Sequence, residues 1–177
     1  IKNKLCAPKN ENWDEALLWW KSLKSDANSI YDDVTKIDAS KVEPTVTWGI
    51  TPGQSVGINQ KIPLLEELSP DDQFVAQEAY EYMGFKPGQS IKDTPIDVCF
   101  IGSCTNGRIS DLRVAAKVLK DKKVSQNIKA FVVPGSEKVA KEAKIEGLDK
   151  IFRDAGFQWR EPGCSKCLAM NSDKLIG

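Results

Sequence analysis

The first apolar pattern along the chain is a stripe at helical spacing near its start. Large side chains recur from Trp13 to Leu23 at intervals of three and four residues, and Asn12 followed by Glu15 has the pattern of a capping box. The spacing predicts an amphipathic helix over 13–24. We interpret its aromatic stripe as a packing face, because large aromatic side chains dominate the energetics of protein cores.

The next part of the chain has little helical periodicity. Residues 26–68 contain a β-like run at 44–49 and a cluster of turn residues at 51–57, which predicts strands and loops. The sequence Ser69-Pro70-Asp71-Asp72 then offers a capping hydroxyl, a proline in the first turn and acid at the positive end of a helix dipole. These features predict a helix that begins there and ends near Gly84.

From residue 98 onwards, short apolar runs alternate with helical stripes. The pattern predicts strands at 98–101, 130–133 and 157–160 and helices at 112–119, 136–147 and 148–155. The order β-α-β-α-β over 97–161 predicts a parallel sheet with right-handed crossovers, and therefore an α/β fold.

Composition and charge narrow the classes of partner. Hydrophobic residues make up 41% and charged residues 28%, which excludes a disordered, collagen-like or coiled-coil chain. Lys+Arg and Asp+Glu both number 25, so there is no basic excess to bind phosphate backbones, and we expect no nucleic-acid partner. No apolar run approaches the roughly 18 residues of a membrane span, and no signal peptide is visible. We therefore expect no membrane partner and a cytoplasmic location.

The chemistry that the chain offers is limited by the absence of histidine. That absence excludes the commonest general base, Ser-His-Asp and Cys-His nucleophile systems, and zinc sites that need an imidazole. The five cysteines are an odd number in a chain without secretory features, which favours reduced, metal-binding or catalytic thiols over disulfides.

Cysteines occur in the loops after the first and third strands of the predicted sheet. The loop at 102–108 contains Cys104, and the loop at 161–167 contains Cys164 and Cys167 as a C-x-x-C pair. Functional loops of parallel sheets lie beyond the carboxyl ends of the strands. We therefore expect the three thiols at one edge of the sheet.

Three thiols at one edge leave several kinds of site open. Structural zinc would need a fourth ligand, and Cys99, within an apolar run, is interpreted as a small core residue. A thioredoxin-like pair would leave Cys104 unexplained. Iron–sulfur clusters are commonly held by four thiolates, and a cluster held by three leaves one iron open to substrate or water, where it can act as a Lewis acid.

The two cysteine motifs resemble the cluster segments of the aconitase superfamily. Residues 100–108, Phe-Ile-Gly-Ser-Cys-Thr-Asn-Gly-Arg, are similar to its first segment. Residues 162–171, Pro-Gly-Cys-Ser-Lys-Cys-Leu-Ala-Met-Asn, are similar to its second, in the version found in isopropylmalate dehydratase large subunits. Lys166 stands where that family more often carries methionine, which puts no ligand in doubt. Three further stretches are similar in the same order, at 47–54, 82–88 and 132–136.

The resemblance implies both the fold and the ligands. It implies a three-layer α/β/α aconitase-like domain with a parallel sheet, in which 69–177 carries the ligands and 1–68 ends a preceding α/β domain with connecting strands and loops. It further implies a [4Fe–4S] cluster on Cys104, Cys164 and Cys167. The fourth iron of that cluster would bind the hydroxyl and carboxylate of a hydroxy-acid substrate.

The activity implied by the resemblance is a reversible dehydration and rehydration that converts 2-isopropylmalate to 3-isopropylmalate in leucine biosynthesis. In the family, a small subunit brings the catalytic serine, and the histidine, acid and Asn/Arg groups lie outside the segment present in this sequence. We therefore assign no catalytic side chain and expect an internal piece of a large subunit, inactive alone. The alternatives are a homoaconitase-like or citraconate-type isomerase, or a non-catalytic thiolate metal-binding module.

Polar residues beside the first cysteine are candidates to support the cluster. Ser103, Thr105 and Asn106 can donate hydrogen bonds to thiolate or sulfide sulfur, or can simply cap the helix that follows. Arg108 is unusual because a cation near a helix N-terminus opposes the dipole. A role toward a carboxylate substrate or the partner subunit and simple solvent exposure both stay open for it.

Overall fold

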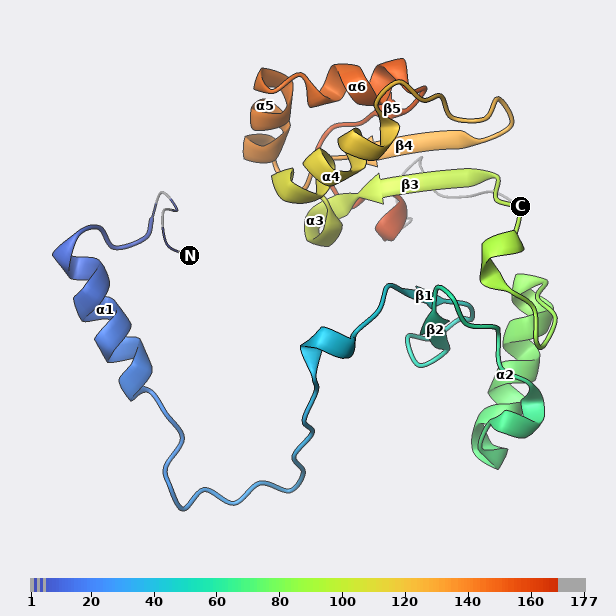
Figure 1. Ribbon diagram of the computed structural model, residues 1–177, viewed down its shortest axis with the longest axis horizontal. Helices are drawn as coiled ribbons and strands as arrows, with labels where there is room; N and C mark the ends of the chain where they lie inside the picture. Colours follow the sequence, from blue (N-terminus) through green and yellow to red (C-terminus); the bar gives the residue numbers. More distant parts are fainter. Residues whose placement is uncertain (1, 3, 5, 169–177) are drawn as a thin grey trace. The chain divides into compact units, whose positions relative to one another are not determined.

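The computed structural model describes residues 2, 4 and 6–168, and it divides the chain into two compact units, Ile1–Pro44 and Thr45–Gly177 (Figure 1). Residues 169–171, which complete the second cysteine motif, lie outside the described residues. No helix in the described part of the chain has both the length and the apolar character needed to cross a membrane.

The first unit contains the predicted amphipathic helix as α1 (Glu11–Ser22). The capping box predicted at Asn12 was wrong: the helix begins earlier, and its N-cap is Asn10, which makes no side-chain capping hydrogen bond. The aromatic stripe is present, with the rings of Trp13 and Trp20 edge to face at a centroid distance of 5.7 Å. None of the described residues in 1–44 is buried. This unit therefore has no core of its own.

A short antiparallel pair, β1 (Thr45–Thr47) and β2 (Ser55–Gly57), opens the second unit. Trp48 follows β1 and stacks on Tyr80 at a centroid distance of 5.0 Å. The hydroxyl of Tyr80 donates a hydrogen bond to the carbonyl of Pro63 at 2.8 Å. The buried core around this stack consists of Trp48, Ile62, Ala76, Ala79 and Tyr80.

This small core takes residues from both sides of position 68. The compact units of the structure accordingly divide between Pro44 and Thr45. The division into 1–68 and 69–177 stays a prediction.

Helix α2 (Pro70–Met83) forms as its sequence predicts. The Ser69 hydroxyl accepts a hydrogen bond from the backbone N–H of Asp72 at 3.2 Å, which satisfies one of the free donors of the first turn. At the other end, Gly84 adopts the left-handed conformation with φ 69°, which glycine adopts without the penalty a Cβ would bring.

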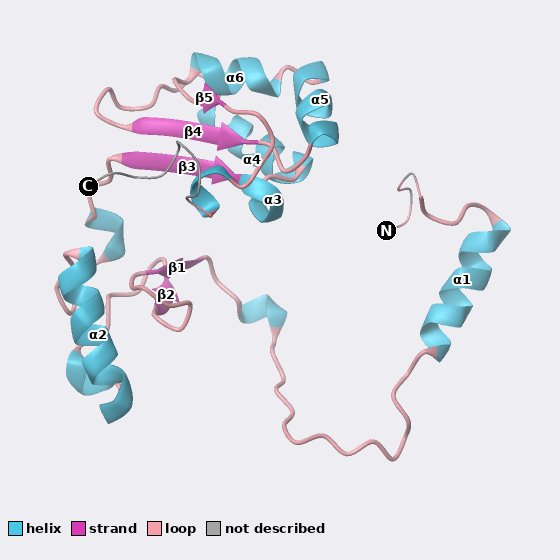
Figure 2. Ribbon diagram, turned by 180° about the vertical axis from the view of Figure 1, so that it is seen from behind, coloured by secondary structure: helices cyan, strands magenta, loops and turns pink. Residues whose placement is uncertain are grey.

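The predicted parallel sheet is confirmed in the chain from residue 98 onwards (Figure 2). Its strand order is β3-β4-β5, and both pairs are parallel. A single helical turn, α3 (Ser103–Asn106), follows the first strand and was not predicted. The remaining elements are the strands β3 (Val98–Gly102), β4 (Lys129–Val133) and β5 (Gln158–Trp159) and the helices α4 (Ile109–Leu119), α5 (Glu137–Ile145) and α6 (Leu148–Asp154).

Alternate strand residues point to the helices and form the main core. Cys99 is in register with Ala130, and both pack into this core with Phe152 of α6, which is fully buried. Cys99 is thus a core residue, as predicted, and burial raises the pKa of its thiol. Helices α4, α5 and α6 all contribute buried residues to this core, so they cover the same face of the sheet.

The opposite face of the sheet carries the other set of alternating residues. Phe100 and Phe131 are in register there, and a 3-10 turn at Ser165–Cys167 lies on this side (Figures 1 and 2). From β3 to the end of the described chain, the structure therefore shows a sheet with one layer of longer helices. The second helical layer of a three-layer arrangement stays a prediction.

Candidate functional site

The first cysteine loop leaves the sheet at Gly102 in a conformation that only glycine tolerates. Gly102 has φ 121°, and a Cβ added there would lie 1.9 Å from the carbonyl oxygen of Val133 on the neighbouring strand. Further along the loop, the N–H of Gly135 donates a hydrogen bond to the carbonyl of Gly107 at 2.8 Å. The loop after β3 is thus fixed against the loop after β4 by backbone contacts.

A buried serine stands next to a cysteine in each of the two motifs. Ser103 precedes Cys104 and Ser165 follows Cys164, and these serines are the buried polar side chains of the described residues. Both have positive φ, 71° for Ser103 and 45° for Ser165. Non-glycine residues in this region carry strain of about 1–3 kcal/mol, and such strain clusters at functional sites. Sequence alone gave no signal for it, because serine is not a residue typical of this conformation.

Hydrogen bonds around the first cysteine favour its thiolate form. The Thr105 hydroxyl lies 3.8 Å from the Cys104 sulfur, and the Ser103 hydroxyl donates to the same sulfur at 3.8 Å. These contacts, Thr105 first, lower the pKa of the Cys104 thiol, and a weaker hydrogen bond with Cys164 acts in the same direction. Cys164 of the second motif therefore contributes to the environment of this sulfur.

The second motif also reaches the first loop through Cys167. A cavity of about 450 Å³ is lined by Ser103, Thr105 and Asn106 of the first loop and by Cys167 of the second. The turn that carries Cys167 is closed by its N–H, which donates to the Cys164 carbonyl at 3.0 Å. Side chains from both loops thus open onto one space at the carboxyl edge of the sheet.

The three thiols are exposed and reduced in this arrangement. Within residues 2, 4 and 6–168, no group of three or more His, Cys, Asp or Glu side chains is arranged to hold a metal ion. The chemistry of the donors nevertheless fits a soft metal centre, because thiols are the protein ligands of iron–sulfur clusters and hydrogen bonds lower the pKa of one of them, Cys104.

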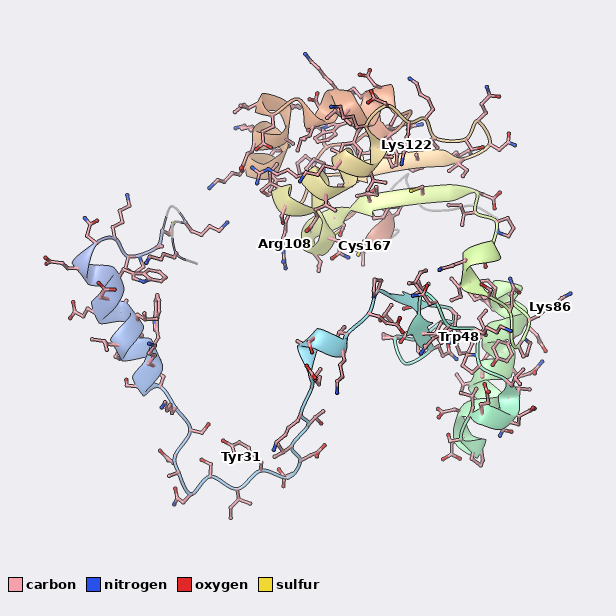
Figure 3. All side chains as sticks on the ribbon, viewed as in Figure 1. Tyr31, Trp48, Lys86, Arg108, Lys122 and Cys167 are labelled. Atoms are coloured by element: carbon pink, nitrogen blue, oxygen red, sulfur yellow. The ribbon has the colours of Figure 1, made fainter. Side chains whose placement is uncertain are left out.

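Arg108 lies at the start of α4, beside the first cysteine loop. Its backbone N–H donates to the carboxylate of Asp111 at 3.1 Å, so Asp111 caps the start of this helix. The Arg108 side chain is exposed, and Figure 3 shows it near the carboxyl end of β3. The Arg108 guanidinium can therefore contact an anion while the backbone N–H of the same residue keeps its hydrogen bond to Asp111.

One feature of the site was missed at the level of sequence. The ring of Phe131 on β4 lies under two cations, with Arg160 Cζ at 5.1 Å and Lys166 Nζ at 4.5 Å from its centroid. The alternation of side chains along β4 indicates that Phe131 lies on the face without helices. It does not indicate which residues cover the ring.

Comparison with known proteins gives a consistent result. The profile described as Aconitase family (aconitate hydratase) matches residues 1–176. A protein named 3-isopropylmalate dehydratase large subunit from Prochlorococcus marinus (strain MIT 9301) is 97% identical over 177 residues, which cover all of this chain and 38% of that protein. Proteins of the same name from P. marinus (strain AS9601) and Nostoc punctiforme are 84% and 64% identical over the same shares. The chain spans 38% of the length of these relatives.

Proposed function

This chain belongs to the aconitase family, and on that basis we propose that it is the cluster-bearing part of a hydro-lyase large subunit. The reaction proposed for the whole enzyme is the dehydration and rehydration that interconverts 2-isopropylmalate and 3-isopropylmalate in leucine biosynthesis. The observation that carries the proposal is the meeting of two cysteine motifs at the carboxyl edge of one parallel sheet.

We assign Cys104, Cys164 and Cys167 as the ligands of a [4Fe–4S] cluster. The lowered pKa of Cys104 supports the assignment, because a thiol must lose its proton to bind metal. When bound, a cluster on three thiolates supplies an iron without a protein ligand, a Lewis acid for a hydroxyl and a carboxylate.

The neighbouring side chains have supporting roles in this proposal. Ser103 donates a hydrogen bond to the Cys104 sulfur, and the Thr105 hydroxyl shares a second one with it; such bonds tune the electronic properties of a metal site. Asn106 lines the same cavity and presents an amide to whatever occupies it. Arg108 presents a guanidinium that can bind a carboxylate in a bidentate manner, either of the hydroxy-acid substrate or of a partner subunit.

The proposal includes a partner, because the relatives are named as large subunits. We propose a hetero-oligomer with a small subunit and expect this chain alone not to turn over substrate. The chain contains no histidine and spans 38% of its relatives' length. General acid–base help is typically worth about 10²–10⁴-fold and substrate positioning can be worth more, so losing both removes measurable turnover.

The cluster assignment is tested by anaerobic reconstitution of the chain, followed by iron and acid-labile sulfide analysis and the visible spectrum. Each of the single substitutions Cys104→Ser, Cys164→Ser and Cys167→Ser should abolish the chromophore. The matched controls Cys6→Ala and Cys99→Ala should leave it intact, because Cys6 lies outside both cysteine motifs and Cys99 packs against the core. Binding of zinc without sulfide would instead support the non-catalytic metal module.

The reaction is tested on the full-length large subunit with its small subunit. Formation of the unsaturated intermediate from 2-isopropylmalate is followed by absorbance, with a citraconate-type substrate offered in parallel. Preference for the second substrate would reassign the enzyme within the family. Turnover by this chain alone would contradict the roles given to the missing parts.

A further inference from the structure

The turn that carries Cys164 and Cys167 rests on the helix-free face of the sheet. Phe131 is 7% exposed although no helix from β3 onwards covers it within the described residues. The side chains that approach it belong to the second cysteine loop: Lys166 lies between the two cysteines, and Arg160 lies where the loop leaves β5. A displacement of the second cysteine loop would therefore expose the Phe131 ring.

The backbone fixes Arg160 on the same face as Phe131. Its N–H donates to the carbonyl of Val132 at 2.9 Å and so continues the β4–β5 ladder by one residue. Trp159, one residue earlier, points into the helix-covered core. Because successive side chains of a strand alternate between faces, Arg160 is directed to the Phe131 side.

We propose that Phe131 is the platform that positions the C-x-x-C turn, held there by Lys166 from within the turn and by Arg160 at its start. The identity of the group that the turn binds rests on the proposed function. The role of Phe131 in positioning the turn does not. Phe131 and its two cations are thus positioning residues: they act on the cluster through the placement of Cys164 and Cys167.

Physical chemistry supports a ring with two cations as such a support. A cation over an aromatic face is attracted by the ring quadrupole, and long cationic side chains also cover apolar surface with their methylene stems. The turn needs a restraint because Ser165 within it has φ 45°, a backbone conformation that is strained for serine. Lys166 directly follows Ser165, so its contact holds the strained residue in place.

The platform also connects the second motif to the first. Phe131 is in register with Phe100 on β3, and Phe100 lines the same cavity as Cys167. Two residues after Phe100, β3 ends at Gly102 and the Cys104 loop begins. The contact with Phe131 therefore also fixes the position of the C-x-x-C turn relative to β3, the strand that leads into the Cys104 loop.

The test is hydrogen exchange of the complete metal-free chain under reducing conditions, read in the peptide covering 160–168. Lys166→Ala should speed exchange by about two- to five-fold, and Phe131→Leu, which loses both contacts, by about five- to thirty-fold. Lys166→Arg should restore the original rate, because it returns a cation to the ring. The control Lys150→Ala, at an exposed lysine of α6, should not change this peptide.

A second readout uses the reconstituted cluster. A chelator should remove iron faster from Phe131→Leu and Lys166→Ala than from the unmodified chain, and at the original rate from Lys166→Arg. If exchange of 160–168 in Lys166→Ala equals that of the unmodified chain, the platform is refuted, even where Phe131→Leu fails to fold. If no cluster forms in the unmodified chain, the proposed function fails, while the exchange data still decide on the platform.

Discussion

Replacing Gly102 with alanine should destabilise the α/β part of the chain strongly and release the Cys104 loop. The added Cβ would lie 1.9 Å from the carbonyl oxygen of Val133 and 2.8 Å from its carbon. Both are backbone atoms of β4, so the contact cannot be relieved by turning a side chain. Either β3 and β4 separate at their carboxyl ends, or the loop leaves β3 by another path.

The magnitude follows from two costs. A residue with a Cβ at φ 121° is strained by about 1–3 kcal/mol, and overpacking against a fixed neighbour adds about 1–3 kcal/mol. We therefore expect Gly102→Ala to lower the free energy of unfolding by about 2–6 kcal/mol, against a typical total of about 5–15 kcal/mol.

Urea unfolding, followed by circular dichroism, measures this loss against two graded controls. Gly147 has φ 73° but nothing within 4 Å of an added Cβ, so Gly147→Ala should cost only about 1–2 kcal/mol for the left-handed backbone. Gly163 has neither a positive φ nor a close neighbour, and Gly163→Ala should stay within about 0.5 kcal/mol of the original. A loss for Gly102→Ala no larger than that for Gly147→Ala would refute the reasoning.

Three further changes test other parts of the structure. Thr105→Val should raise the pKa of Cys104, because the thiolate loses a hydrogen bond, so the pH profile of alkylation at Cys104 should shift to higher pH; an unchanged pH profile would contradict the contact. Arg113→Met should lower the Tm by breaking its ion pairs with two glutamates on and after α5, and the difference should shrink in concentrated salt; equal shifts at both ionic strengths would rule out an ionic origin. Phe152→Ala should cost about 3–5 kcal/mol in urea unfolding, whereas Phe74→Ala, at a side chain 79% exposed, should cost almost nothing.

Hydrophobic periodicity was sufficient to predict the sheet. Short apolar runs at 98–101 and 130–133 became parallel neighbours, and helix α4 between them packs its apolar stripe into the core beside the sheet. Helix ends were predicted correctly where a cap has a distinctive side chain, as at Ser69. The start of α1 was wrong because two asparagines, Asn10 and Asn12, both offer a plausible cap and periodicity does not choose between them.

The candidate site was less predictable than the fold. Topology alone placed Cys104 and the C-x-x-C pair at one edge, because strand order determines where loops emerge. The features that shape that edge depend on tertiary contacts: positive φ at Ser103 and Ser165, and the ring of Phe131 beneath two cations. Local sequence carries no preference for these, since serine is not typical of a left-handed backbone and phenylalanine is ordinary in a strand.

The absence of buried residues in the described part of 1–44 determines what an unfolding experiment on this chain detects. Because the urea m-value and the heat capacity of unfolding scale with newly exposed surface, both should be those of a protein shorter than 177 residues. The optical signal is divided in the same way. Three of the five tryptophans lie in α1 and are not buried, so a fluorescence change on unfolding comes from Trp48 and Trp159, one reporter for each core.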